Sequence, residues 1–246
     1  MLSTPTEQKL YSMRLGVMAE TWQAQTRETK APELHFDERF GLIVDAEHLH
    51  RQNQRLSRLL RDARLRISGA TLEDIKPSAS AGINAESLAQ LRSERWITEH
   101  LNVLITGQTG VGKTHLACAL GQFACRRGYR TTYKRLPRLL EELTVARADG
   151  SYARLLSKLE KSHVLIIDDW GLTPLKDSHR RDLLEILEDR HGHSSTVVTS
   201  QLPVSKWHGY IGEPTIADAI LDRLVHSAYK YELTGDSRRK TQKKTT

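Results

Sequence analysis

The stretch Gly107-Gln108-Thr109-Gly110-Val111-Gly112-Lys113-Thr114 decides the fold of this 246-residue chain. It follows the apolar segment 101–106 (LNVLIT) and opens a helical pattern over 113–127. The spacing is that of a phosphate-binding loop, in which glycines let backbone N–H groups converge on phosphate oxygens at the positive end of a helix. A chance glycine-rich turn is the alternative, and the strand before the motif and the helix after it argue against it. The predicted nucleotide-binding residues are Gly107, Gln108, Thr109, Gly110, Val111, Gly112, Lys113, Thr114 and His115.

A second motif supplies the acids that such a loop requires. The apolar run 164–167 ends in Asp168 and Asp169, which is typical of a buried strand that carries carboxylates to the C-terminal edge of a sheet. We expect Asp168 and the Thr114 hydroxyl to hold Mg²⁺, Lys113 to contact the β- and γ-phosphates, and Asp169 to deprotonate the attacking water. The alternative for Asp169 is a cap on the following turn.

A third strand, 195–200, ends in small polar residues next to Gln201. The hydroxyl of Ser200 or the amide of Gln201 could hydrogen-bond the γ-phosphate or the water, although a strand end that simply meets solvent fits the composition equally well.

Elsewhere the chain alternates strand and helix patterns from residue 101 onward, which predicts an α/β fold with a mainly parallel, five-stranded sheet. The expected strands are 101–106, 131–135, 163–168, 195–200 and 228–233, and the expected helices are 113–127, 137–147, 151–161, 178–191 and 214–227. The first part has almost no strand signal and predicts helices over 7–29 and 37–67, followed by a Ser-, Gly- and Pro-containing linker over 68–84. We therefore expect a helical domain over 1–70 that binds DNA or a partner, and an ATPase domain over 71–246.

Composition narrows the class of protein. The chain carries 37 Lys and Arg against 30 Asp and Glu, a net charge of +7, and 38% hydrophobic residues. No apolar run reaches the roughly 18 residues that span a bilayer, and the N-terminus lacks the pattern of a signal peptide. The two cysteines cannot form a disulfide framework. The expectation is a cytoplasmic protein with no membrane partner.

Four longer motifs resemble the AAA+ ATPases, and more narrowly the IstB transposition helpers, which are related to the DnaC helicase loaders. They are GQTGVGKTHLA (107–117), LIIDDWGLTPL (165–175), STVVTSQLPVSKW (195–207) and IADAILDRL (216–224). The resemblance implies a P-loop AAA+ core that hydrolyses ATP with Mg²⁺ under stimulation by DNA. It also implies a homo-oligomer assembled with ATP that binds double-stranded DNA with little sequence preference and assists a cognate transposase.

The same resemblance assigns positions within that core. It implies that strand 195–200 lies between strands 101–106 and 163–168, with Ser200 or Gln201 sensing the γ-phosphate. It places Arg223 where these ATPases have an arginine that reaches the γ-phosphate of a neighbouring subunit. A surface charge paired with Asp222 or Asp218 is the alternative. The chain ends soon after strand 228–233, so we expect no helical lid, and Arg238 is a weak candidate for the arginine that such a lid would carry.

Positive charge concentrates in three stretches, 51–66, 126–138 and the tail from residue 236. Such charge suits a DNA backbone, whereas a solvated surface is the alternative for any single stretch. The DNA-binding candidates are Arg51, Arg55, Arg58, Arg61, Arg126, Arg127, Arg130, Arg238 and Arg239. Two other functions remain open: a replicative helicase loader of the DnaC type, and a nucleotide-gated scaffold that barely hydrolyses ATP.

Overall fold

The computed structural model describes residues 4–27 and 34–235 of the chain. It divides into two compact units, residues 1–58 and 59–246, and the division falls inside one long helix. Arg238 and Arg239 lie outside the described residues. In the described part, no helix is both long and apolar enough to cross a bilayer.

The first unit is helical, as predicted, and contains α1 (Thr4–Ser12), α2 (Gly16–Arg27) and most of α3 (Phe36–Ala63). The single helix expected over 7–29 is interrupted after Ser12, where Arg14 takes a left-handed conformation (φ 59°). The Glu47 carboxylate on α3 accepts hydrogen bonds from the N–H groups of Val17 and Met18, and thereby caps the first turn of α2. A side chain distant in sequence therefore fixes where α2 begins.

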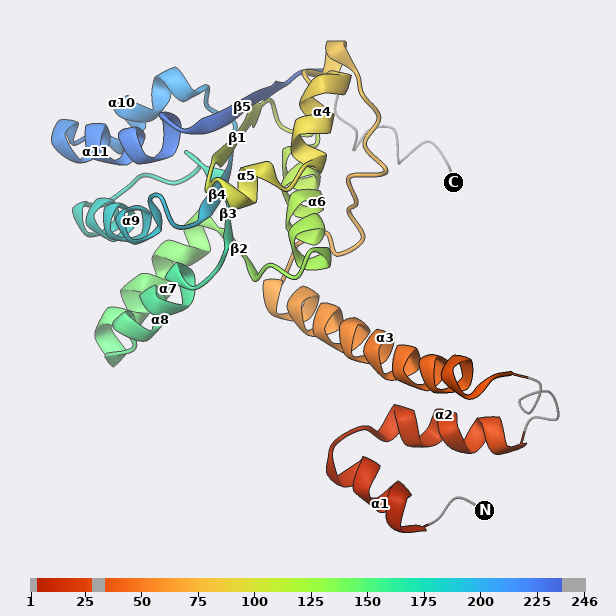
Figure 1. Ribbon diagram of the computed structural model, residues 1–246. Helices are drawn as coiled ribbons and strands as arrows, with labels where there is room; N and C mark the ends of the chain where they lie inside the picture. Colours follow the sequence, from red (N-terminus) through yellow and green to blue (C-terminus); the bar gives the residue numbers. More distant parts are fainter. Residues whose placement is uncertain (1–3, 28–33, 236–246) are drawn as a thin grey trace, which may run out of the picture. The chain divides into compact units, whose positions relative to one another are not determined.

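The second unit is built on a five-stranded parallel sheet in the order β2-β3-β4-β1-β5 (Figure 1). Its strands are β1 (Asn102–Gly107), β2 (Thr131–Arg135), β3 (Val164–Trp170), β4 (Ser195–Ser200) and β5 (Ala228–Leu233). The predicted α/β class is confirmed, and so is the position of strand 195–200 between the first and third strands.

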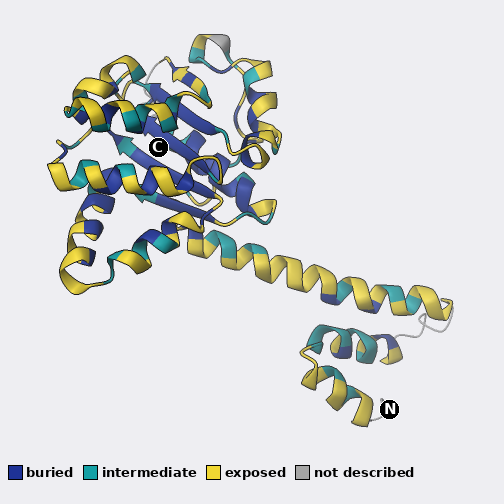
Figure 2. Ribbon diagram, turned by 60° about the vertical axis from the view of Figure 1, so that its left-hand side comes forward, coloured by how far each residue is buried: buried dark blue, intermediate teal, exposed yellow. Residues whose placement is uncertain are grey.

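Helices cover both faces of the sheet, so β1, β3 and β4 are almost completely buried, whereas the edge strand β5 is partly exposed (Figure 2). The long helices of this unit are α6 (Lys113–Arg126), α7 (Leu136–Asp149), α8 (Tyr152–Glu160), α9 (Asp177–Arg190) and α11 (Pro214–Val225). Because side chains alternate along a strand, Ile105 and Ile166 pack in the core that contains α6, whereas Leu104 and Ile167 pack in the core shared by α7, α9 and α11. The apolar runs in the sequence correspond to these two cores.

Short elements complete the second unit. They are η2 (Ala79–Ala81), α4 (Ala85–Arg92), α5 (Arg95–Thr98), η3 (Val204–Lys206) and α10 (Trp207–Ile211). The sequence does not predict α4, α5 or α10, because each is too short to show a helical period. Their positions depend on buried side chains such as Trp96 and Trp207, both 0% exposed.

The segment expected to be a linker, 68–84, is instead part of the second unit. Leu72, Ile75 and Ile83 are buried in the core that contains α6. At Gly82 a Cβ atom would lie 1.8 Å from the carbonyl oxygen of Glu232 on β5, so this turn packs directly against the sheet edge. The second unit thus begins at residue 59, before the boundary expected after residue 70, because its core includes side chains of the segment that follows α3.

Candidate functional site

The phosphate loop connects the C-terminal end of β1 to the first turn of α6. Gly107, Gly110 and Gly112 have φ values of 139°, 91° and 108°, in the left-handed region that side chains rarely adopt. A Cβ atom on Gly107 would also lie 2.2 Å from the carbonyl oxygen of Leu233. Gly112 is the N-cap of α6, and no side chain caps this helix. Its first-turn N–H groups and its dipole thus favour an anion at this position.

Lys113 is folded back onto the loop. Its Nζ donates hydrogen bonds of 2.8 Å to the carbonyl oxygens of Gly107 and Gln108. Across the loop, the Thr109 hydroxyl donates to Oε1 of Gln201 over 2.8 Å. The loop therefore contacts Gln201 through Thr109, while Lys113 lies on the loop carbonyls.

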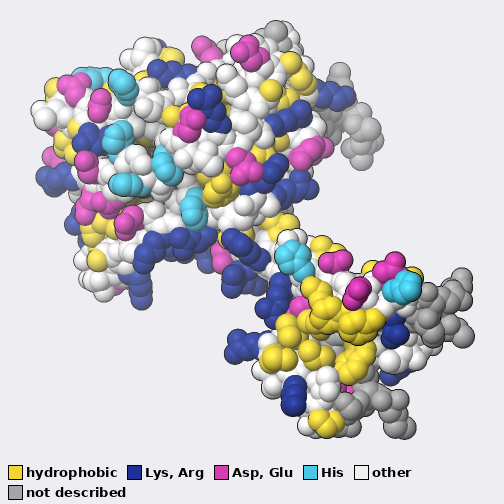
Figure 3. All heavy atoms as spheres, in the orientation of Figure 1, with side chains coloured by type: hydrophobic (Ala, Val, Ile, Leu, Met, Phe, Trp, Pro, Cys, Tyr) yellow, Lys and Arg dark blue, Asp and Glu magenta, His cyan; other side chains and the backbone are white. Residues whose placement is uncertain are grey.

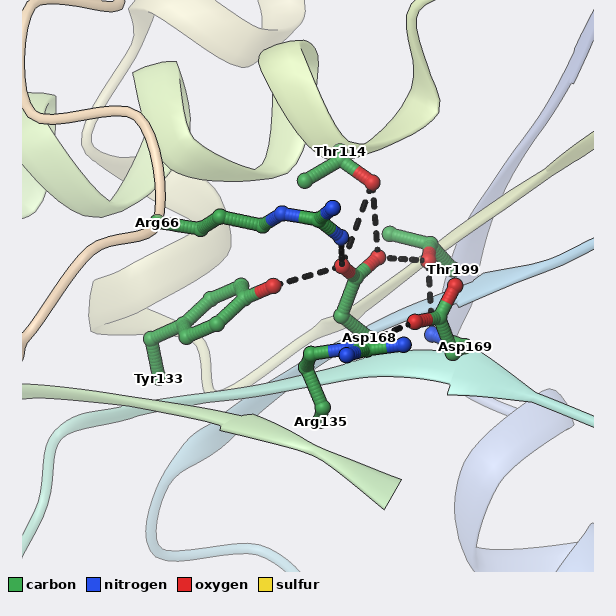
Figure 4. Close-up of polar contacts among 7 residues, drawn as sticks. All are labelled: Arg66, Thr114, Tyr133, Arg135, Asp168, Asp169 and Thr199. Carbon is green, nitrogen blue, oxygen red and sulfur yellow. Dashed lines mark hydrogen bonds and ion pairs between the residues drawn. The ribbon is translucent and has the colours of Figure 1, made fainter. Parts of the chain in front are cut away.

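Asp168 receives three hydroxyl groups although it is completely buried (Figure 4). Thr114 Oγ1 lies 3.0 and 3.1 Å from its two carboxylate oxygens, and Tyr133 donates to Oδ2 over 2.6 Å. Thr199 donates to Oδ1. NH1 of Arg66 lies 3.9 Å from Oδ2, the oxygen that also accepts from Tyr133. The predicted pair of Thr114 and Asp168 is in contact, and both supply the oxygen ligands that Mg²⁺ prefers.

Burial and this carboxylate raise the pKa of Tyr133 far above its usual range. The Tyr133 hydroxyl consequently remains a proton donor to Asp168 at any physiological pH. Such donors stabilise the charged form of a buried carboxylate. Tyr133 therefore helps to hold the Asp168 carboxylate in place by donating to it.

Asp169 takes a left-handed conformation (φ 65°), which is uncommon for a residue with a side chain. Its backbone N–H donates to Thr199 Oγ1 over 3.3 Å, and its Oδ2 accepts from Nε of Arg135 over 2.8 Å. The side chain of Asp169 is 19% exposed, whereas Asp168 is buried. The carboxylate nearer to solvent is the one suited to accept a proton from water.

Of the two candidates at the end of β4, only Gln201 contacts the phosphate loop. Ser200 is completely buried, and its hydroxyl donates to the carbonyl oxygen of Trp170 over 2.7 Å. It also accepts from the Leu202 N–H, so it links the ends of β3 and β4. Ser200 therefore has a structural contact here, and Thr199 is the β4 hydroxyl that reaches the acids.

A mostly apolar hollow lies beside the phosphate loop. It is lined by residues of the segment before α4, of the loop, of α6 and of β5, among them Ile75, Ile83, Val111, His115, Leu116 and Leu233. The sequence predicts Val111 and His115 as nucleotide-binding residues but does not reveal the hollow, because part of its wall comes from the supposed linker. Its apolar wall has the chemistry that an aromatic base requires, but its volume of about 20 Å³ means that the walls must part to admit one.

Arg223 lies away from the phosphate loop of its own chain. The side chain of Asn102, the first residue of β1, donates to its carbonyl oxygen over 2.8 Å, whereas the loop follows the other end of that strand. The Arg223 guanidinium forms an ion pair with Glu188 on α9, and it donates to the Ala219 carbonyl. The partners expected in the surface-charge alternative, Asp218 and Asp222, are not the partners observed.

Some arginines of the basic stretches form ion pairs with acidic side chains in the structure. Arg126 pairs with Glu73 and Arg127 with Glu94, at 2.9 and 2.7 Å. The stretch 126–138 has no acid in its sequence, but the fold brings acids to it.

The candidates of the stretch 51–66 differ from one another. Arg51 pairs with Glu47 at 2.7 Å and donates to the Arg14 carbonyl, so it stabilises the first unit. Arg58 and Arg61 are exposed, as is Arg130 in the neighbouring stretch, and Arg61 lies 3.8 Å from the carboxylate of Asp62. In Figure 3, Lys and Arg side chains gather along the lower margin of the second unit.

Sequence reasoning missed four residues of the site: Arg66, Tyr133, Arg135 and Thr199. The signal for two of them is the register of the sheet, since Arg135 on β2 is the parallel partner of Asp168 on β3. The pairing of strand 131–135 with strand 163–168 brings both Tyr133 and Arg135 to the acids.

Comparison with known proteins places the chain in a family. The family of IstB-like ATP binding proteins matches residues 8–246. The chain belongs to this family. An insertion-sequence ATP-binding protein of Sinorhizobium fredii is 46% identical over 99% of both chains. Another, from Pseudomonas fluorescens, is 46% identical over 83% of this chain and 89% of its own. The predicted resemblance to the IstB group is confirmed.

Solved structures agree on the fold. The DnaC helicase loader matches with a TM-score of 0.56 at 22% identity and covers 67% of this chain and 97% of its own. DnaI matches with a TM-score of 0.58, also at 22% identity, and covers 72% and 94%. The predicted P-loop AAA+ fold of this IstB-like chain is thereby confirmed.

Proposed function

We propose that this protein is an ATP-hydrolysing, DNA-binding assistant of a transposase. The observation that carries the proposal is the contact of Thr114 with Asp168 directly after a phosphate loop, in a chain of a family whose members are named for insertion sequences. An ATP-binding protein encoded by an insertion sequence would be expected to act in the transposition of that sequence.

ATP binding is supported by the loop and the hollow beside it. The triphosphate would lie on the N–H groups around Gly110 and Gly112, with its charge balanced by Lys113 once that side chain leaves the loop carbonyls. The adenine would lie against Ile83, His115 and Leu233 once the hollow between them widens, because its present volume of about 20 Å³ holds little more than one water molecule.

Thr114 and Asp168 would hold Mg²⁺, and their donor set fits this ion because both offer hard oxygen atoms. The ion would neutralise charge on the β- and γ-phosphates. Tyr133 and Thr199 keep the Asp168 carboxylate in place by donating to it.

Hydrolysis would use Asp169 as the general base. Its carboxylate would take the proton of the attacking water, while Gln201, held beside the loop by Thr109, would orient that water or the γ-phosphate. The ion pair with Arg135 occupies Oδ2 of Asp169. Release of this pair would activate the base.

A homo-oligomer is supported by the position of Arg223. Since its backbone is tied to the start of β1, it is distant from the phosphates of its own subunit. An arginine from a neighbouring subunit could stabilise the charge that develops on the γ-phosphate. We infer that ATP lies between subunits, so that nucleotide binding promotes assembly.

Duplex DNA is the proposed partner of the assembly. Arg55, Arg58 and Arg61 recur at helical spacing on α3, so they can lie along a phosphate backbone without reading bases. Several subunits aligned by ATP would multiply such contacts. The first unit also exposes large apolar side chains, including Phe36, Phe40 and Leu49, which suit contact with the transposase.

A replicative helicase loader is the second candidate, because the fold is also that of DnaC and DnaI. At 22% identity these structures support the fold alone, whereas relatives at 46% identity are insertion-sequence proteins.

A reconstituted transposition reaction tests the proposal. The transposase of the same insertion sequence is incubated with donor and target DNA, with and without this protein and ATP. We expect insertion products to require both, and products that form equally well without this protein would contradict the proposal.

A further inference from the structure

Arg66 lies beside Asp168, the carboxylate proposed to bind Mg²⁺. The proposed mechanism gives Arg66 no role. Its guanidinium NH1 lies 3.9 Å from Oδ2 of Asp168. In Figure 4, Arg66 and Thr114 approach this carboxylate from the same side, whereas Arg135 lies on the other. The side of Asp168 that would face Mg²⁺ is therefore the side toward which Arg66 points.

The backbone around Arg66 is fixed by packing. Leu65 lies so close to α6 that a Cβ atom on Gly121 would be 2.7 Å from its Cδ2. Ile67 packs against the same core, and burial raises the pKa of the neighbouring Cys118 thiol, which is hydrogen-bonded to the backbone of Ile67 and Arg66. A glycine at position 121 thus lets this segment lie across α6 and present Arg66 to the site.

We propose that Arg66 is an internal counter-cation of Asp168 that competes with Mg²⁺ and thereby sets the metal affinity of the site. This inference rests on the proposed binding of Mg²⁺ with ATP. A buried carboxylate without a metal is costly unless a positive charge lies near it, and Arg66 supplies that charge. Mg²⁺ held by Thr114 and Asp168 would share this carboxylate with Arg66, and the repulsion between the two cations would weaken the contact of Arg66.

The geometry suits an exchange of this kind. At 3.9 Å the guanidinium is close enough for attraction but beyond hydrogen-bond distance, and its side chain is 44% exposed, so it can turn into solvent. Tyr133 and Thr199, by contrast, are neutral donors that remain compatible with a bound cation. Apart from Thr114, the partners of Asp168 are thus two neutral donors that position the carboxylate and one cation that balances its charge.

The test compares Arg66→Gln with Arg66→Lys in the full chain, and Arg64→Gln is the matched control because it removes a charge two residues away. Binding of a fluorescent ATP analogue is titrated with Mg²⁺. We expect Arg66→Gln to lower the half-saturating Mg²⁺ concentration by about two- to fivefold, in line with a partly exposed ion pair. Arg66→Lys and Arg64→Gln should match the wild type.

Thermal unfolding supplies a second readout. Without nucleotide and Mg²⁺, Arg66→Gln should unfold at a temperature a few degrees below that of the wild type. The difference between the two unfolding temperatures should disappear when nucleotide and Mg²⁺ are added. The role of Arg66 would be overturned if Arg66→Gln had the half-saturating Mg²⁺ concentration of the wild type and if Mg²⁺ did not change the difference between their unfolding temperatures. A wild-type protein that binds no nucleotide with Mg²⁺ would contradict the proposed function itself.

Discussion

Nε of Arg135 lies 2.8 Å from Oδ2 of Asp169, so the acid that we propose as the general base is paired with a cation from the neighbouring strand. Asp169 also has a left-handed backbone, a conformation that persists only when its surroundings hold it. Strain and ion pairing at one residue are typical of a site whose active arrangement differs from its resting one.

This pair predicts the effect of Arg135→Gln. Removal of the guanidinium frees the Asp169 carboxylate for the attacking water, so basal ATP hydrolysis without DNA should rise, by about two- to tenfold if the pair is worth about 1 kcal/mol. Steady-state phosphate release measures it, with Arg138→Gln, in the first turn of α7, as the control. A fall in basal hydrolysis with nucleotide binding intact would show that Arg135 acts on the substrate instead.

Arg223 predicts complementation between subunits. Asp169→Asn and Arg223→Ala should each be inactive alone, but mixed oligomers contain interfaces that combine an intact acid with an intact arginine. Phosphate release should therefore recover in part at intermediate mixing ratios. If oligomers form normally in the mixture and no ratio restores hydrolysis, Arg223 has no role across the subunit interface.

The arginines of α3 predict the salt dependence of DNA binding. Removal of one arginine–phosphate interaction should reduce the slope of log affinity against log salt by about 0.9. The triple change of Arg55, Arg58 and Arg61 to Ala should weaken duplex binding and flatten this slope. The pair Arg126 and Arg127 is the control, because their ion pairs with Glu73 and Glu94 are short, at 2.9 and 2.7 Å, whereas Arg61 lies 3.8 Å from Asp62. Fluorescence anisotropy at several salt concentrations compares them, and equal slopes for the triple variant and wild type would move the DNA-binding surface elsewhere.

Gly121 predicts a cost in stability for a single methyl group. A Cβ atom there would lie 2.7 Å from both Ile166 Cδ1 and Leu65 Cδ2, so Gly121→Ala should lower the free energy of unfolding by about 1–3 kcal/mol. Gly209→Ala on α10 meets nothing within 4 Å and should be neutral or slightly stabilising. Urea unfolding measures both, and similar midpoints for the two variants would show that α6 and the segment after α3 can move apart freely.

The parts of the fold that the sequence predicts are those with a local cause. The phosphate loop, the acids after β3 and all five strands follow from glycine spacing and from apolar runs that must be buried. The helix α4 and the segment 68–84 could not be predicted in this way, because their buried side chains, such as Leu72 and Leu88, pack against elements distant in sequence.

In the site, too, the residues that belong to local motifs could be predicted, and the residues brought in by the fold could not. Thr114 and Asp168 belong to motifs, and they meet as expected. Tyr133 and Arg66 belong to none, and their approach to Asp168 depends on the register of β2 with β3 and on the space left by Gly121. Ion pairs such as Arg126 with Glu73 likewise arise from the fold, so charge counted along the sequence overstates the basic surface.

The measurement that tests the central claim most directly is Mg²⁺-dependent ATP hydrolysis by the wild-type protein and by Asp169→Asn, each with and without long duplex DNA. Lys113→Ala, which should lose nucleotide binding, controls for contaminating ATPases. We predict that the wild type hydrolyses ATP and is stimulated by DNA, and that Asp169→Asn binds ATP but releases phosphate at least about 100-fold more slowly, in the range that removal of a general base costs. Hydrolysis by Asp169→Asn at the wild-type rate, or a wild type that does not respond to duplex DNA at low salt, would contradict the account.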